Sequence, residues 1–136
     1  MTHNSENFRS NCPINFVLET FGDKWTLLIV RDLMFKSKQY YGEFLKSNEK
    51  ISTNILADRL QKLESSGVIK KAMDTQNKSK VLYSLTDKGK DLLPIMLEIT
   101  SWSHKYDDKT NVPENFIKAL STNRASVISQ TLSKLK

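Results

Sequence analysis

The sequence predicts a mostly helical α+β fold made of several amphipathic helices and one short β-hairpin. Apolar residues recur at helical spacings of three and four over most of the chain. Residues 68–86 instead alternate between apolar and polar, as paired strands do. A hydrophobic share of 38%, with only 4 Gly and 3 Pro, is typical of a folded protein. The length of 136 residues favours a single domain over residues 1–136.

Two helices are expected near the N-terminus. Pro13 suits the first position of an amphipathic helix, and Gly22 suits the position just past its end. Residues 24–35, KWTLLIVRDLMF, are apolar almost all round, which predicts a buried central helix that Asp23 can cap. The apolar stripe of the first helix is Ile14, Val17, Leu18 and Phe21. The second helix is expected to place Trp25, Leu28, Ile29 and Leu33 in the core.

A brief helix carrying Tyr41, Phe44 and Leu45 precedes a longer helix over residues 52–65. Ser52 lies where an N-cap belongs, and the helix is expected to end at a glycine, Gly67. The apolar stripe of this longer helix is Ile55, Leu56, Leu60 and Leu63. Two helices joined by a short connection are a helix-turn-helix in outline.

The remaining segments complete the pattern. Residues 68–86 predict a hairpin around the turn-rich sequence DTQNKS, and Thr86 can cap the next helix. Pro94 lacks an N–H donor, so that helix should bend or begin late there. Residues 113–136 predict one interrupted helix or two short ones as a C-terminal extension. Its apolar residues, expected in the core or at a dimer interface, are Phe116, Ile117, Leu120, Val127, Ile128, Leu132 and Leu135.

This order of elements is that of a winged helix-turn-helix domain with extra helices at both ends. Residues 52–65 would be the recognition helix, and the hairpin over residues 68–86 would be the wing. The charge supports the interpretation, since residues 46–90 hold ten cations and five acids and so carry +5 of the net charge of +6. A solvated lysine face and a surface that binds a polyanion both account for such a cluster.

Several motifs together resemble the HxlR-type branch of the bacterial MarR-like transcriptional regulators. They are the Cys-Pro pair at 12–13, GDKWTLLIVRDL, ISTNILADRLQKLESSGVIKK and VLYSLTDKGKDLLPIMLEITSW, and they cover residues 12–103. The resemblance implies a homodimer that binds DNA and is built by its first and last helices. It also implies a recognition helix in the major groove and a wing tip on the backbone or minor groove.

The chain departs from the family pattern at two places. Tyr40 and Tyr41 stand where the family usually has an Arg-Phe pair, so the usual cation is missing there. The wing sequence NKSKVLYS contains no proline, and Leu82 replaces the usual acid. These changes bear on individual DNA contacts and leave the predicted fold intact.

Base reading in the major groove needs short polar side chains on the exposed face near a helix N-terminus. Capping is favoured for Ser52, whereas a base or phosphate contact is favoured over plain exposure for Thr53 and Asn54. Phosphate would repel Asp58 unless it is paired, and Lys62 stands four residues on, where it can pair. The candidate DNA-contacting residues are Ser52, Thr53, Asn54, Ala57, Asp58, Arg59, Gln61, Lys62, Lys70, Lys71, Lys78 and Lys80.

Cys12 is the one cysteine, so no internal disulfide is possible. It is either a small, partly buried residue at a helix start or a sensor of electrophiles or oxidants, the role that the resemblance implies for this position. A helix N-terminus and a nearby Arg9 would favour the reactive thiolate.

Catalytic and metal sites find little support in the sequence. His3 and His104 are isolated, Asp107 and Asp108 fit a solvated turn, and no pair of His or Cys has metal-ligand spacing. We therefore expect no enzyme activity, cofactor or metal, although a small-molecule effector between dimer helices stays open. No apolar stretch suits a membrane span or signal peptide, which favours the cytoplasm. A nonspecific nucleoid-type DNA-binding protein and a winged-helix protein-interaction module remain as alternative functions.

Overall fold

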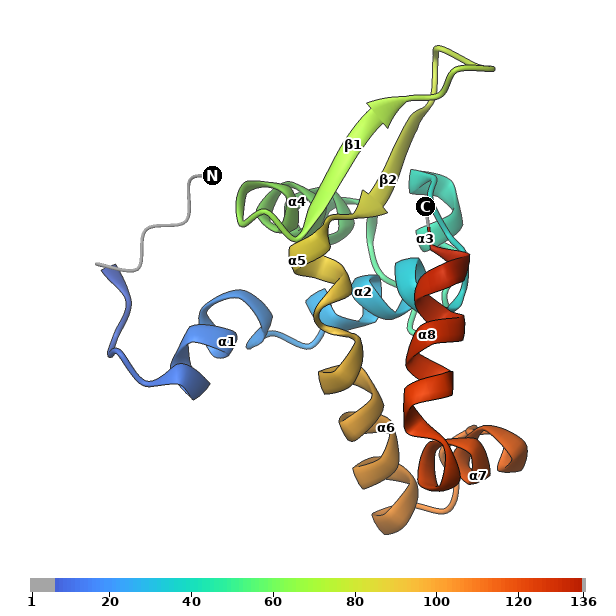
Figure 1. Ribbon diagram of the computed structural model, residues 1–136. Coiled ribbons are helices and arrows are strands. Elements are labelled where there is room, and N and C mark those ends of the chain that lie inside the picture. The colour runs from blue at the N-terminus through green and yellow to red at the C-terminus, as the bar shows by residue number, and fades with distance from the viewer. Residues whose placement is uncertain (1–6, 136) are drawn as a thin grey trace.

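A computed structural model describes residues 7–135 of the chain. Its helices pack together at the base of a two-stranded antiparallel sheet, which projects from one end of the molecule (Figure 1). The predicted α+β architecture with a wing is therefore confirmed. The elements are α1 (Pro13–Phe21), α2 (Thr26–Phe35), α3 (Tyr41–Phe44), α4 (Thr53–Ser65), β1 (Ile69–Met73), β2 (Val81–Leu85), α5 (Asp87–Lys90), α6 (Leu93–Tyr106), α7 (Glu114–Thr122) and α8 (Arg124–Lys134).

The start of α2 is capped as the sequence predicts. Oδ2 of Asp23 accepts hydrogen bonds from the backbone N–H groups of Trp25 at 3.0 Å and Thr26 at 3.1 Å. These are N–H groups near the helix start, where the helix itself supplies no acceptor. Ile29 and Leu33 of this helix are buried, as expected, while Trp25 is half-buried against the same core.

Both predicted ends of α4 are confirmed. The backbone N–H of Ile55 donates to Oγ of Ser52 at 3.3 Å, so Ser52 is the N-cap. Gly67 adopts a φ of 80°, and the N–H of Val68 then reaches the carbonyl of Leu63 at 3.0 Å. This is a Schellman ending, which favours glycine because other residues rarely adopt positive φ.

The hairpin leads directly into α5 and α6. Ile69 pairs with Leu85 at its base and Met73 pairs with Val81 near its tip. After the short helix α5 the chain turns, and α6 begins at Leu93 with Pro94 in its first turn. The prediction that this helix begins late, at Pro94, is confirmed. Proline suits the first turn because the N–H groups there have no partner within the helix, so the missing N–H of proline costs no hydrogen bond.

The C-terminal extension forms two helices, α7 and α8, that pack on the chain's own core. Asn123 separates them, and its side chain accepts a hydrogen bond from the N–H of Ser126 at 3.3 Å. Leu120 and Val127 are buried in the core that α2, α4 and α6 share. Figure 1 shows α8 running from α7 back toward the hairpin. Most of the apolar stripe that the sequence left open to core or dimer interface therefore packs within the chain.

Candidate nucleic-acid interface

The outer face of α4 carries the polar side chains that the sequence singled out. Thr53 and Asn54 are exposed in its first turn, on the side opposite the buried Leu56, Leu60 and Leu63. Ala57, Asp58, Gln61 and Lys62 continue the exposed face along the helix. The N-terminus of a helix also carries a partial positive charge, which favours a nearby phosphate. The first turn of α4 thus combines accessible polar groups with a favourable local field.

Two long-range contacts hold α4 in place. The hydroxyl of Tyr41 donates to the backbone carbonyl of Thr53 at 2.7 Å, which joins α3 to the first turn of α4. Nε of Arg59 donates to Oδ2 of Asp23 at 2.9 Å, which joins the middle of α4 to the start of α2. The exposed face of α4 is therefore fixed relative to the helices beneath it.

These contacts keep the carboxyl of Asp23 ionised well below neutral pH. Burial of the carboxyl opposes ionisation, but hydrogen bonds from Thr26, Arg59 and the N–H of Trp25 outweigh burial and lower the pKa of Asp23 to about 2. The side chain is 23% exposed, so water screens the interaction only in part. Asp23 therefore caps α2 and anchors Arg59 with one carboxylate.

The predicted ion pair between Asp58 and Lys62 is wrong. Oδ2 of Asp58 lies 2.5 Å from Nη1 of its neighbour Arg59. The guanidinium of Arg59 forms ion pairs with both Asp23 and Asp58. Its planar group carries several N–H donors and can therefore bind two carboxylates at once. Lys62 is left exposed, without an ion-pair partner among the described residues. Arg59 is thereby engaged with carboxylates of the fold, whereas Lys62 remains available.

The four wing lysines that the sequence proposed differ in their surroundings. Lys70 and Lys78 are exposed, and Lys78 lies in the turn between β1 and β2. Nζ of Lys71 forms an ion pair with Oε1 of Glu64 at 3.6 Å. Nζ of Lys80 lies 5.0 Å from the ring centre of Tyr40, the geometry of a cation–π contact. The exposed cations at the tip are the ones best placed to reach a partner.

Sequence reasoning missed what Tyr40 and Tyr41 do. Tyr41 bonds α4 as described above, and the hydroxyl of Tyr40 donates to Oδ2 of Asp74 at 2.7 Å. This hydrogen bond lowers the pKa of Asp74 and raises the pKa of Tyr40. The sequence shows two adjacent tyrosines at the start of a helix, but it does not indicate which residues their hydroxyl groups bind.

Apolar side chains lie exposed on α1 and α6. Ile14 of α1 is 70% exposed, and Trp102 of α6 is 67% exposed. Large exposed apolar residues gathered on two helices are typical of a surface that another protein covers. We call the following residues the apolar surface: Ile14, Phe16, Leu18, Ile95, Ile99, Trp102 and Tyr106.

Cys12 is exposed at the N-cap position of α1, rather than partly buried. The guanidinium of Arg9 contacts the side chains of Asn15 and Glu19, with 3.4 Å between its Nε and Oε2 of Glu19. Arg9 is thus paired with Glu19, whose carboxylate offsets its charge. Cys12 is nevertheless open to a reagent from solvent.

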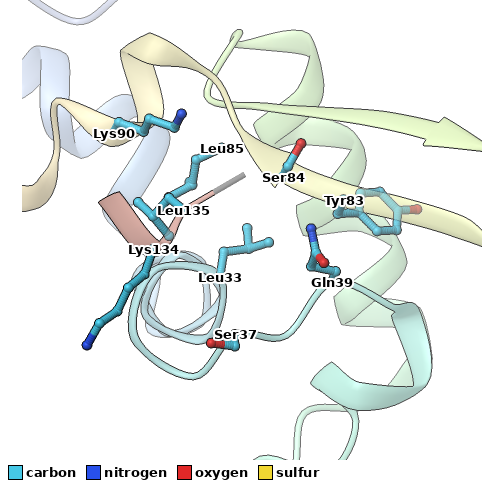
Figure 2. Close-up of a pocket in the computed structure, with 9 residues that line it drawn as sticks. All are labelled: Leu33, Ser37, Gln39, Tyr83, Ser84, Leu85, Lys90, Lys134 and Leu135. Carbon is cyan, nitrogen blue, oxygen red and sulfur yellow. The ribbon is translucent and has the colours of Figure 1, made fainter. Parts of the chain in front are cut away.

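A small pocket lies between the end of α2, strand β2 and the end of α8. Figure 2 shows Leu33, Leu85 and Leu135 around it, with the side chain of Lys134 directed away. Its volume of about 200 Å³ is smaller than the ~300–1,000 Å³ of common small-molecule sites. The pocket is lined at one side by the end of α8, the last helix, and by no residue of α1.

Residues 7–135 were expected to hold neither a metal site nor a membrane-spanning helix. That part of the chain holds no group of three His, Cys, Asp or Glu side chains placed to bind a metal. None of its helices combines the length and the apolarity that a bilayer crossing requires.

Comparison with known proteins places this arrangement in a family. The model of the HxlR-like helix-turn-helix family matches residues 20–111. The HTH-type transcriptional regulator YdeP of Bacillus subtilis (strain 168) is 34% identical over 117 residues, which cover 86% of this chain and 90% of YdeP. The structure of PA1607 superposes with a TM-score of 0.68 at 36% identity, covering 78% of this chain and 72% of PA1607.

A third similar protein has been solved with a bound small molecule. The structure of quinone-bound YodB from B. subtilis is 27% identical, has a TM-score of 0.56, and covers 69% of this chain and 98% of that one. The matched region contains the whole helix-turn-helix and the wing described above. This chain therefore belongs to the HxlR-like helix-turn-helix family of transcriptional regulators.

Proposed function

We propose that the protein binds a specific DNA operator by placing α4 in the major groove and the wing on the flanking backbone. The observation that supports this proposal is the exposed polar first turn of α4, together with a projecting hairpin whose tip carries the exposed Lys78 and Lys80. An α-helix fits the major groove, where base edges differ between all four base pairs. A cation at a projecting tip suits the phosphate backbone.

The residues divide by role under this proposal. Thr53 and Asn54 read bases, because short side chains at the helix N-terminus stay well placed. Ala57 and Gln61 extend the reading face, while Asp58 suits cytosine, whose amino group donates. Lys62, Lys70, Lys71, Lys78 and Lys80 contact phosphates. Ser52 and Arg59 act within the fold, as the cap of α4 and the partner of Asp23.

We also infer a homodimer that buries the apolar surface on α1 and α6. Ile14, Trp102 and Tyr106 are each at least 67% exposed in the single chain, and covering them removes apolar area from water. A twofold dimer would present two copies of α4 to half-sites about 34 Å, or one helical turn, apart. We infer that a dimer that binds DNA in this way acts in the cytoplasm.

Selection of bound fragments from random DNA tests the function. We expect recovery of an inverted repeat whose half-sites lie one helical turn, or a multiple of it, apart. Salt-sensitive binding without any enriched motif would instead support a nonspecific nucleoid-type protein. Absence of salt-dependent DNA binding would support a winged helix that serves protein contacts.

Cys12 supports a second proposal, that the regulator responds to electrophiles or oxidants. Its thiol is exposed at the start of α1, the helix that carries part of the apolar surface. The similar protein YodB has been solved in a quinone-bound form. An adduct on Cys12 would therefore lie beside the inferred dimer interface, where it could alter the spacing of the two α4 helices.

A further inference from the structure

We propose that Tyr40 is a positioning residue that sets the angle of the wing relative to α4, and so fixes where the wing tip meets DNA. This inference rests on the proposed DNA-binding function. Tyr40 is the N-cap residue of α3, and this segment is hydrogen-bonded to both elements that are expected to contact DNA. It reaches one of them directly, and its neighbour Tyr41 reaches the other.

The contact with the wing is made to the residue that begins the hairpin turn. The Tyr40 hydroxyl donates to Oδ2 of Asp74 at 2.7 Å, across 34 positions of sequence. Asp74 also organises the turn, since its Oδ1 accepts from the N–H of Gln76 at 3.0 Å and its own N–H donates to the carbonyl of Lys80 at 3.0 Å. Tyr40 is therefore hydrogen-bonded to the residue whose own hydrogen bonds stabilise the turn.

The same side chain places a cation of the tip. The ammonium of Lys80 lies 5.0 Å from the centre of the Tyr40 ring. A cation is attracted to the face of an aromatic ring, so the ring restricts where this long side chain points. Tyr40 thus contacts the turn through its hydroxyl and a phosphate-directed lysine through its ring.

Tyr40 is itself rigidly held. Oε1 of Glu43 accepts hydrogen bonds from the N–H groups of Gln39 and Tyr40, both at 2.9 Å. The carbonyl of Gln39 accepts from the N–H of Tyr83 in β2 at 2.8 Å. The backbone around Tyr40 is thereby joined to α3 on one side and to the middle of the wing on the other.

The wing depends on such contacts because little of it packs against the core. In β1 only Ile69 is buried, and the four residues that follow it are exposed. An isolated two-stranded hairpin is marginally stable in water. Of the hydrogen bonds that join the hairpin to the helices in the described chain, the Tyr40–Asp74 bond lies nearest the tip. Its loss should free the tip while leaving the core unchanged.

The test compares variants of the full-length protein on an operator obtained by selection. Tyr40→Phe removes the hydroxyl but keeps the ring, and Asp74→Ala removes the acceptor. Asp74→Asn is the control for charge, because its amide oxygen still accepts. Tyr83→Phe is the matched control for a hydroxyl, since Tyr83 lies in the same hairpin and packs edge-on against Phe44.

We expect Tyr40→Phe to weaken operator binding by up to roughly eightfold at 0.1 M salt, the effect of one lost phosphate contact. The log–log salt slope should fall in magnitude by up to about 0.9. Exchange of the backbone N–H groups of Asp74 and Gln76 should accelerate. The thermal midpoint should shift by no more than about 3 °C. In an Asp74→Ala background, Tyr40→Phe should cause no further loss, because the acceptor of its hydroxyl is already gone. Asp74→Asn should bind at least as well as the wild type.

Several outcomes would overturn the inference. Wild-type affinity and slope in Tyr40→Phe would do so, and so would losses from Tyr40→Phe and Asp74→Ala that simply add. An affinity loss with an unchanged slope and a lowered thermal midpoint would indicate a role in stability alone. Failure of the wild type to bind DNA would overturn the proposed function as well, which separates the two failures.

Discussion

Removal of both tip lysines, by Lys78→Ala and Lys80→Ala, tests whether the wing touches the DNA backbone. Both side chains are exposed in or next to the turn between β1 and β2, and neither forms an ion pair with a described residue. Their loss therefore disturbs few contacts of the fold, apart from the contact of Lys80 with the ring of Tyr40. Most of any effect on DNA binding should therefore come from lost contacts with DNA and not from a change in the fold.

The magnitude follows from the release of counterions. Each phosphate that a cation neutralises contributes about 0.9 to the slope of log affinity against log salt concentration. The magnitude of this slope should therefore fall by about 1.8 in the double variant. At 0.1 M salt each contact strengthens binding by roughly eightfold, which gives roughly 60-fold for two contacts. The loss should be equal for selected and random DNA, because phosphate contacts carry no sequence information.

Fluorescence anisotropy at a series of salt concentrations measures both quantities. Lys109→Ala with Lys118→Ala is the matched control, since these lysines are equally exposed near α7, at the opposite end of the molecule from the wing (Figure 1). The control should keep the wild-type slope. An unchanged slope in the tip variant, or an equal change in the control, would refute the placement of the wing on phosphate.

Three further predictions concern other parts of the molecule. Because the pKa of Asp23 is about 2 in the fold and 3.8 in its unperturbed state, its contribution is complete above pH 4 and is lost as the pH falls through 2. Urea unfolding should thus show Asp23→Asn abolishing about 2 kcal/mol of acid-linked stability, and equal pH profiles would contradict this. Trp102→Glu should give monomers by sedimentation velocity and weaken binding to a two-half-site operator, whereas a persistent dimer would place the interface elsewhere. Mass spectrometry after quinone or peroxide treatment should find Cys12 modified and operator affinity reduced, with Cys12→Ser resistant; an unmodified thiol with intact binding would end the sensing proposal.

The sequence predicted the elements whose causes are local. Ser52 as a cap, Gly67 as a helix end and the late start of α6 at Pro94 each depend on the chemistry of one residue and its immediate neighbours. The hairpin likewise follows from alternation within one short segment. Such features can be derived from spacing because the backbone partners lie within a few residues.

Partners distant in sequence could not be predicted in the same way. Spacing suggested Lys62 as the ion-pair partner of Asp58. Arg59 is that partner instead, and it also binds Asp23, 36 residues earlier in the chain. The Tyr40–Asp74 bond spans a similar separation. Periodicity identifies an apolar face without identifying what covers it, so the sequence could not decide that α7 and α8 pack on their own core.

The ratio of affinities for selected and random DNA, at one salt concentration, tests the central claim most directly. The wild type should bind the selected operator at least about 10³ times more tightly. Asn54→Ala should lower that ratio by about 1–3 kcal/mol of discrimination and leave binding to random DNA unchanged. A ratio near one, or an equal loss on both DNAs in Asn54→Ala, would contradict base reading by the first turn of α4.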